Sequence, residues 1–271
     1  MDKINVIKVG GAVVETPASL QELINQFASM PGYKVLVHGG GRSATRIASQ
    51  LGIESHMIGG RRITDEDMLQ VVTMVYGGLV NKRIVALLQA NGVNAVGLTG
   101  ADMDIIRSHR RKPTMVTMDN GTQELIDFGF VGDVDHADGH RLASLIKPQN
   151  GMEAVVPIVA PLTHDGQGNI LNTNADTMAA TVAKALTEEF EVTLTYCFEK
   201  PGVMADAEDD DSVIPSINTA SYARLKADGI VSGGMIPKLD NAFDSISSGV
   251  KRVVITHFSD IMATMGTVIE K

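Results

Sequence analysis

Three glycine-rich turns are the parts of this 271-residue sequence that point most directly to chemistry. They are IKVGG at 7–11, VHGGGRS at 37–43 and VSGGMIPK at 231–238. Each adjoins an expected strand or helix, so that backbone N–H groups can converge there on an anion. Glycine also lets a ligand approach the main chain without meeting a Cβ atom. The three turns therefore predict an anion-binding site.

These turns match neither common nucleotide-binding fingerprint. The stretch HGGGRS lacks the Lys-Ser/Thr ending of a P-loop. It also lacks the G-x-G-x-x-G spacing of a dinucleotide-binding fingerprint, because no third glycine follows. A dinucleotide-dependent dehydrogenase is therefore disfavoured.

Two lysines adjoin the glycine turns. Lys8 ends the first apolar run, and an ammonium group buried there requires a counter-anion. Lys238 lies just inside an expected helix start, where a cation opposes the helix dipole unless an anion is nearby. The alternatives are an edge-strand lysine that reaches solvent for Lys8 and an exposed lysine for Lys238.

Three further polar residues are candidates for the same site. Asn174 and Asp176 precede an expected helix, and Asp176 could alternatively cap it. Arg62 stands two residues before Thr64, which we expect to cap a helix. Arg62 could either clamp a carboxylate or form a surface ion pair. The seven histidines show no metal-ligand spacing, so we expect no zinc site.

Short apolar runs alternate with helical patterns, which is typical of β-α-β units and an α/β fold. Expected strands cover 4–9, 34–38, 93–98, 154–160, 192–198 and 252–258. Expected helices cover 19–30, 42–52, 65–91, 175–186, 219–229 and 237–249. The segments 103–111 and 129–137 predict hairpin strands at a sheet edge. Gly77 and Gly78 interrupt the long helix, either for close approach to a partner helix or as a tolerated kink.

The overall composition excludes several classes of protein. The formal net charge of -9 and the pI near 5.2 disfavour a binder of nucleic acid or anionic membranes. The one cysteine, Cys197, cannot form an intrachain disulfide, which fits a reducing compartment. The N-terminus is too charged for a signal peptide, and no run reaches the ~18 apolar residues of a membrane span. We expect a cytoplasmic protein.

Seven segments, in order along the chain, together resemble the amino acid kinase family. They are IKVGG, VHGGGRSA, RRITDEDM, VGLTGADMDII, DFGFVGDV, LNTNADTMAA and SGGMIPKLDNAFDSI. The resemblance implies a three-layer α/β/α sandwich around an open, mostly parallel eight-stranded sheet, in one kinase domain over 1–271. An N-terminal lobe, about 1–170, would bind the acylated amino acid and form a homodimer. A C-terminal lobe, about 171–271, would bind ATP.

The reaction that the resemblance implies transfers the γ-phosphoryl group of ATP to the side-chain carboxylate of N-acetyl-L-glutamate, in arginine biosynthesis. The Mg²⁺ that accompanies ATP would be held mainly by the nucleotide phosphates, without a metal site on the protein. The implied catalytic residues are Lys8, Lys238 and Asp176, with Asp176 holding both lysines. The implied substrate-binding residues are Gly11, Gly39, Gly40, Gly41, Arg62, Asn172 and Asn174. The implied nucleotide-binding residues are Glu199, Lys200, Pro201, Gly202, Val203, Met204, Ile230, Val231 and Ser232.

Some points stay open within this resemblance. The stretch CFEKPGVM replaces the family's usual Thr/Ser-Asp-Val before a glycine, which leaves the ATP contacts undetermined. No helical extension precedes the first strand, so we expect a homodimer without arginine feedback. A succinyl group in place of acetyl would add a second carboxylate, for which Arg42 or Arg61 could supply a cation.

Two further alternatives concern the class of function. One is a kinase for another small amino-acid carboxylate. The other is a non-catalytic sensor of amino acids or nucleotides. Retention of Lys8, Asp176 and Lys238 argues against the sensor, because a sensor would not need all three.

Overall fold

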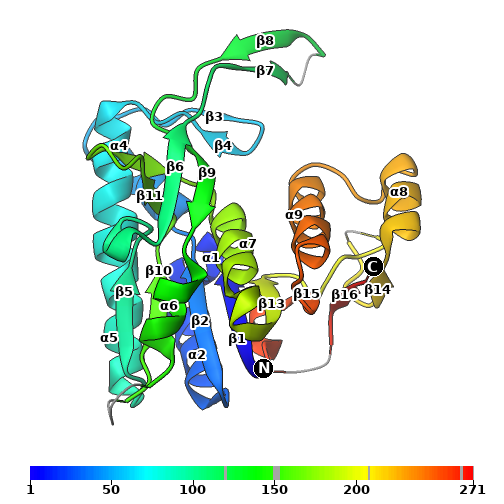
Figure 1. Ribbon diagram of the computed structural model, residues 1–271. Coiled ribbons are helices and arrows are strands. Elements are labelled where there is room, and N and C mark those ends of the chain that lie inside the picture. The colour runs from blue at the N-terminus through cyan, green and yellow to red at the C-terminus, as the bar shows by residue number, and fades with distance from the viewer. Residues whose placement is uncertain (119–120, 149–152, 207, 263–264, 271) are drawn as a thin grey trace.

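The computed structural model describes residues 1–118, 121–148, 153–206, 208–262 and 265–270 (Figure 1). Within these residues the main sheet has eight strands. In spatial order they are β14 (Ser216–Ile217), β16 (Thr267–Ile269), β15 (Arg252–His257), β13 (Phe190–Phe198), β1 (Asp2–Val9), β2 (Tyr33–His38), β10 (Val156–Val159) and β5 (Ala95–Leu98). Only the pairing of β16 with β15 is antiparallel among the described strand pairs of this sheet. The predicted mostly parallel, eight-stranded sheet is confirmed.

Helices cover both faces of this sheet and complete three layers. One face carries α1 (Gly11–Glu15), α2 (Pro17–Ser29), α3 (Gly41–Gln50), α4 (Glu66–Val72), the π-helical segment η1 (Thr73–Val80) and α5 (Asn81–Ala90). The other carries α6 (Gly139–Ile146), α7 (Ala175–Ala185), α8 (Thr219–Ala227) and α9 (Met235–Ser247). Short 3-10 turns are η2 (Asp102–Asp104), η3 (Leu186–Glu188) and η4 (Phe258–Asp260).

The central strand β1 shows why the sequence folds into these layers. Its side chains alternate: Ile4 and Val6 enter one apolar core, and Ile7 and Val9 enter the other. A parallel strand covered on both faces needs apolar residues at nearly every position. The continuous apolar runs of the sequence therefore mark this sheet.

Smaller sheets stand at one end of the main sheet (Figure 1). They are the four-stranded β12 (Ile170–Asn172), β11 (Leu162–His164), β6 (Ile106–Arg110) and β9 (Gly132–Ala137), and the hairpins β3 (Met57–Ile58)–β4 (Arg61–Arg62) and β7 (Thr114–Thr117)–β8 (Gln123–Ile126). Strands β6 and β9 pair antiparallel, as predicted, and β9 lies at the edge of this four-stranded sheet, which is separate from the main sheet. The chain leaves that sheet after Leu98 and builds a second one.

The long helix predicted over 65–91 begins differently from the prediction. Thr64 does not cap it; the Asp65 carboxylate accepts the N–H of Met68 at 2.8 Å instead. The Thr64 hydroxyl faces inward, donating to the carbonyl of Arg62 at 3.2 Å and accepting from Asn172 Nδ2 at 2.9 Å. A buried hydroxyl with these two partners is not free to turn toward the helix.

The same helix runs without a break over Glu66–Ala90 and is long and apolar enough to cross a membrane by length and composition. That property is weak support for a span, because core helices pass the same test. Here Met68, Val71, Val72, Ile84 and Leu88 are fully enclosed in the core. The apolar composition of this helix is therefore explained by its packing in one of the two helical layers.

Candidate active site

Lys8, Asp176 and Lys238 meet although they are far apart in the sequence. The carboxylate of Asp176, in the first turn of α7, has Oδ1 2.6 Å from Lys8 Nζ and Oδ2 2.6 Å from Lys238 Nζ. Lys8 is only 6% exposed and lies on β1, between β13 and β2. The alternative of an edge-strand lysine is therefore wrong, and the expected anionic partner of both lysines is Asp176.

The charge of Asp176 depends on those lysines. Burial alone would raise the pKa of its carboxyl group, but the charges and hydrogen bonds of Lys8 and Lys238 outweigh burial and lower this pKa to about 2. Asp176 does not cap α7. Asn174 does so, its Oδ1 accepting from the N–H groups of Asp176 and Thr177 at 2.8 and 3.1 Å. The Asp176 carboxylate is thus left to hold the two ammonium groups.

The turns after β1 and β2 bring main-chain amides together beside Lys8. A Cβ atom placed on Gly11 would lie 3.5 Å from the nitrogens of both Gly40 and Gly41. Gly11 and Gly41 are the first residues of α1 and α3, where N–H groups have no acceptor within the helix. The N–H of Gly39, by contrast, is already bonded to the carbonyl of Val9 at 3.1 Å. The amides available to bind an anion here are therefore those of Gly11, Gly40 and Gly41 rather than that of Gly39.

The two adjacent arginines of β4 differ in how firmly they are held. Arg62 is 7% exposed, and its Nη2 donates to the carbonyl of Gly41 at 2.8 Å and to Thr45 Oγ1 at 2.9 Å. Its Nη1 donates to Ser55. For the guanidinium of Arg61, no hydrogen bond or ion pair is found among the described residues, although the charges of Arg111 and Asp133 act on it. Arg62 is thus braced against the start of α3, while the guanidinium of Arg61 is not hydrogen-bonded.

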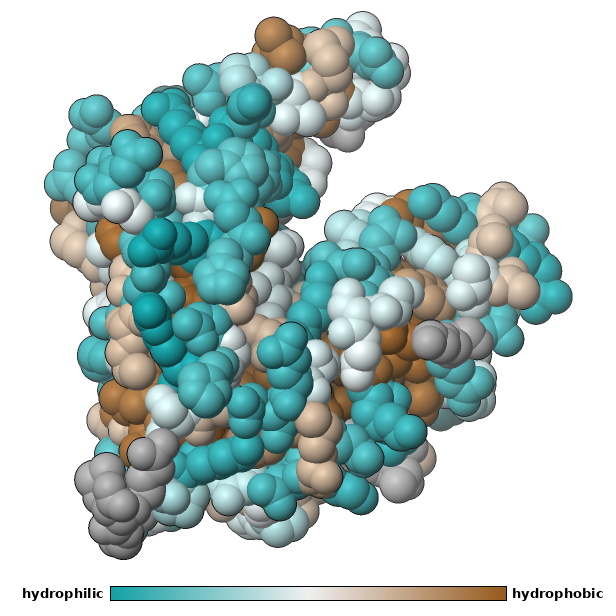
Figure 2. All heavy atoms as spheres, in the orientation of Figure 1, coloured by the Kyte–Doolittle hydropathy of each residue, from teal (hydrophilic) through white to brown (hydrophobic). Residues whose placement is uncertain are grey.

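These groups line one cavity of about 210 Å³. All the residues predicted for catalysis and substrate binding line it except Lys238, which reaches Asp176 from α9. Met57, Val131 and Pro161 add apolar wall to this polar lining. Figure 2 shows the molecule hollowed between its two lobes. A small anionic ligand with an apolar portion fits this lining.

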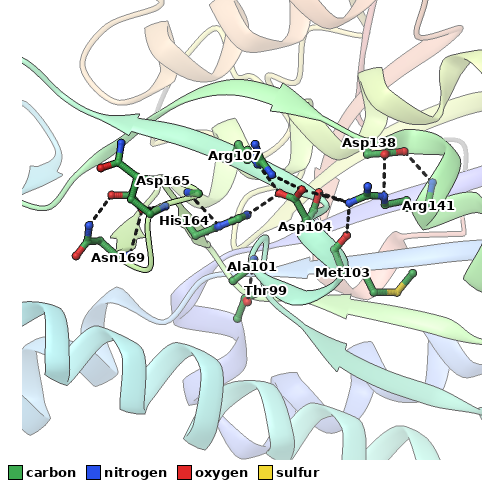
Figure 3. Close-up of polar contacts among 12 residues, drawn as sticks. Thr99, Ala101, Met103, Asp104, Arg107, Asp138, Arg141, His164, Asp165 and Asn169 are labelled. Carbon is green, nitrogen blue, oxygen red and sulfur yellow. Dashed lines mark hydrogen bonds and ion pairs between the residues drawn. The ribbon is translucent and has the colours of Figure 1, made fainter.

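A polar network supports the turn end of the hairpin that carries Asn172 (Figure 3). Asp104 accepts two hydrogen bonds of 2.6 Å from Arg107 and lies 2.9 Å from His164 Nε2, at the end of β11. The hydrogen bonds from Arg107 are the main reason why the pKa of Asp104 falls to about 2. Met103 and Asp104 both have positive φ, 54° and 56°, which costs free energy outside glycine. The network holds this strained turn and, through His164, the β11–β12 hairpin.

The residues predicted to bind the nucleotide lie apart from this cavity, and none of these nine described residues lines it. Val203 and Val231 are each 2% exposed, with side chains in the core on the α9 face of the sheet. Glu199 lies 3.8 Å from Arg42 at the surface, and Lys200 pairs with Asp210 at 3.0 Å. Val203 and Val231 can therefore offer a nucleotide only main-chain contacts.

Comparison with known proteins places the chain in a family. A family model described as "Amino acid kinase family" matches residues 3–257. The chain belongs to the amino acid kinase family. It is 60% identical, over 270 residues, to a Bacteroides thetaiotaomicron protein named acetylglutamate kinase, covering 100% of this chain and 99% of that one.

Solved structures agree with the fold. A Streptococcus mutans protein is 25% identical with a TM-score of 0.75, covering 98% of both chains. Giardia carbamate kinase is 16% identical with a TM-score of 0.66, covering 100% of this chain and 99% of that one. The amino acid kinase fold predicted from the sequence is confirmed.

Sequence reasoning missed two residues that shape the site of this kinase. Tyr76 lines the cavity, and a Cβ on Gly40 would lie 2.9 Å from its ring. Glu15 accepts the N–H of Ser43 in the first turn of α3. It thereby replaces the capping side chain that Gly40, the N-cap residue of α3, lacks. The glycine pair at 77 and 78, which interrupts the helical pattern, was a signal that could have drawn attention to the adjacent Tyr76. No pattern in the sequence pointed to Glu15.

Proposed function

We propose that this chain is an acetylglutamate kinase, which transfers the γ-phosphoryl group of ATP to the side-chain carboxylate of N-acetyl-L-glutamate in arginine biosynthesis. The arrangement of Lys8, Asp176 and Lys238 beside a cavity lined by glycine amides carries the proposal. The identity of 60% with a protein named acetylglutamate kinase supports the choice of substrate.

The chemistry requires placement and charge rather than a base. A side-chain carboxylate is already ionised at neutral pH and can attack the γ-phosphorus directly. As the new O–P bond forms, the bond between that phosphorus and the bridging oxygen breaks, and ADP leaves with the electron pair. The ammonium groups of Lys8 and Lys238 stabilise the charge on the phosphoryl oxygens and on the leaving oxygen.

The remaining groups of the cavity would orient the acceptor. The amides of Gly11, Gly40 and Gly41 donate to the reacting carboxylate and the arriving phosphoryl group. Asn172 and Asn174 bind the acylamino group and the α-carboxylate. Arg62 would clamp the α-carboxylate with the N–H groups that are not already bonded to Gly41, Thr45 and Ser55. These roles agree with the contacts described above and stay proposals.

ATP would bind mainly to the C-terminal lobe, about 171–271, and the acceptor to the lobe of about 1–170. Mg²⁺ would come with the nucleotide, held by its phosphates. Among the described residues no group of three or more His, Cys, Asp and Glu side chains is placed to hold a metal ion. The carboxylate nearest the cavity, that of Asp176, is engaged by two lysines.

A homodimer in the cytoplasm completes the proposal. The segment η1 exposes Met74 and Leu79, which are 54% and 51% accessible, on either side of Gly77 and Gly78. Apolar side chains beside glycines suit the close packing of this helix against its copy. The one cysteine, Cys197, is buried and forms no disulfide, which fits a reducing compartment such as the cytoplasm.

A second candidate substrate is an N-acylglutamate with another carboxylate, such as N-succinyl-L-glutamate. The guanidinium of Arg61 in the cavity lining favours it, because a cation whose N–H groups make no hydrogen bond within the described residues can bind a second anion. Arg61→Gln would then lower kcat/KM for the succinyl compound much more than for the acetyl compound. Equal losses on both would remove this candidate.

The test is turnover with a panel of acceptors. ADP release and trapping of the acyl phosphate by hydroxylamine are measured with N-acetyl-L-glutamate, N-succinyl-L-glutamate, L-glutamate and L-aspartate. We expect acyl phosphate from an N-acylglutamate and none from the free amino acids. Absence of turnover with every acceptor would reject the proposed function and favour a sensor.

A further inference from the structure

His38 is a fully buried histidine with no part in the mechanism proposed above. It is the last residue of β2, directly before the glycine turn, and is 0% exposed. Its Nδ1 lies 2.9 Å from the carbonyl oxygen of Gly39. Its Nε2 lies 3.1 Å from Nδ2 of Asn81, which is 1% exposed at the start of α5. A buried imidazole with two partners has a defined proton position.

Asn81 determines which nitrogen of His38 carries the proton. Asn81 Nδ2 also lies 2.8 Å from the carbonyl of Ile158, which can only accept, so this atom is the amide donor. Asn81 Oδ1, the acceptor, lies 3.3 Å from the ammonium of Lys82. Nε2 of His38 must therefore accept, and Nδ1–H donates to Gly39. Burial, partly offset by the Gly39 contact, lowers the pKa of His38 to about 4, so that the ring is neutral at physiological pH.

The contact with Gly39 fixes a peptide group that faces the cavity. The carbonyl of Gly39 and the N–H of Gly40 belong to one trans peptide and point in opposite directions. With the carbonyl held on the buried side by His38, the Gly40 N–H points the other way. Gly40 is the first amide of the turn that is free, since that of Gly39 is bonded to Val9.

We infer that His38 and Asn81 are positioning residues: through the neutral, Nδ1-protonated imidazole they hold the Gly39–Gly40 peptide with its N–H aimed at the phosphoryl group in transfer. This inference rests on the proposed function. Rotation of that peptide would replace a donor by a carbonyl oxygen facing an anion. Such a change weakens the transition state, where charge on the phosphoryl oxygens must be matched.

The residues around Asn81 restrict its side chain to one position. A Cβ atom on Gly97, in β5, would come 1.8 Å from Asn81 Oδ1 and 2.6 Å from Lys82 Nζ. Glycine at this position therefore makes the space that Asn81 occupies. The carbonyl of Ile158 in β10 and the His38 ring hold the Nδ2 side of the amide. Lys82, which donates to the carbonyl of Gly97 in β5 at 3.1 Å, contacts Oδ1 on the other side.

Two variants of His38 separate positioning from mere packing. His38→Asn keeps a donor near the place of Nδ1 and loses the contact with Asn81, while His38→Leu loses both. We expect His38→Leu to lower kcat about 10²-fold with little change in the KM for the acceptor. His38→Asn should recover most of the lost kcat, although we expect both variants to be less stable than the wild type in thermal denaturation. Wild-type kcat in folded His38→Leu, or no recovery in His38→Asn, would overturn the inference.

A measurement on the wild-type protein is independent of substrate. Nitrogen-15 NMR of the imidazole, from about pH 5 to about pH 8, should find His38 neutral and protonated on Nδ1 throughout. Protonation on Nε2, or titration near pH 6.5, would overturn the positioning role even if the enzyme turns over. Failure of the acceptor panel, in contrast, would reject the proposed function and leave this measurement valid.

Discussion

At the scale of single residues, the site depends on one carboxylate between two ammonium groups. A buried ion pair gains little when both partners are present, but removing one partner leaves the other charge buried and costs several kcal/mol. Asp176 contacts Lys8 and Lys238 at 2.6 Å each, so the trio keeps one net positive charge. That net charge is what an incoming phosphoryl group meets.

Lys8→Ala should lower kcat by about 10²-fold or more while changing the KM for the acceptor far less, because Lys8 acts on charge that grows in the transition state. Steady-state kinetics with both substrates measure the two effects separately. Lys3→Ala is the matched control: Lys3 lies on the same strand, with a loose surface contact of 4.0 Å to Glu191. A Lys8→Ala enzyme with near-normal kcat would contradict the assigned role.

Asp176→Asn should destabilise the fold at neutral pH, by roughly 3–5 kcal/mol, because two ammonium groups lose their partner. The folded pKa of Asp176, about 2, is below its unfolded value of about 3.9, so its contribution is complete above ~pH 4 and is lost as the pH falls toward 2. The gap between wild type and variant in the free energy of unfolding should therefore shrink in acid. Urea denaturation over a pH series measures it, and a gap independent of pH would refute the charge argument.

The sequence identified these residues, and the family resemblance implied that Asp176 holds both lysines, a contact that the structure shows. Lys8 and Lys238 were recognisable because lysines beside glycine turns need an anion. Without the resemblance their shared partner could not be derived, because Asp176 was equally suited to capping a helix that Asn174 caps instead. The N–H of Gly39 was assigned to the ligand, although pairing with β1 takes it. Competition between partners is decided by three-dimensional distance, which residue types alone do not contain.

At the scale of elements, the segment η1 packs against the glycine turn at 39–41 and continues directly into α5. Its wider π spacing places Tyr76 and Val80 against Gly40, and the helix that follows starts with Asn81 against His38. Sequence periodicity predicted one helix with a break at the glycines. Periodicity does not distinguish a kink from a π segment, because both interrupt the 3.6-residue repeat.

Gly40→Ala should disturb this junction more than Gly41→Ala does. A Cβ at Gly40 would lie 2.9 Å from Tyr76 Cδ1, so the ring or the turn has to move. A Cβ at Gly41 would meet its nearest atoms at 3.7 and 4.0 Å, which is ordinary contact. We expect Gly40→Ala to lower both the melting temperature and kcat/KM, and Gly41→Ala to leave the melting temperature unchanged or higher. Equal melting temperatures for the two variants would disprove the packing argument.

At the scale of the whole molecule, one continuous sheet runs through both proposed lobes. Strand β1 pairs with β2 on one side and with β13 on the other, so the proposed boundary near residue 170 does not divide the sheet. The sequence predicted this sheet well because its strands are apolar on both faces. The hairpin β7–β8 was not predicted, because its strands are largely exposed and carry no apolar run.

Leu79→Glu should convert the proposed homodimer to a monomer, because a charge would be buried where two copies of η1 meet. Sedimentation analysis measures the mass of the particle directly. Leu125→Glu is the control, since Leu125 is also exposed, at 65%, but lies on the hairpin β7–β8. A Leu79→Glu protein of unchanged mass would rule out this face as the interface.

The π spacing of η1 accommodates about one residue more than an α-helix does over the same rotation. Eight residues at this wider spacing turn through about the same angle as seven residues at 3.6 per turn. Deleting one residue within Thr73–Val80 and returning the segment to α-helix would therefore leave Asn81 facing His38, while the side chains inside the segment, Tyr76 among them, would be reset against Gly40. Loss of a single codon in this stretch would thus be absorbed locally, without turning the rest of the helix.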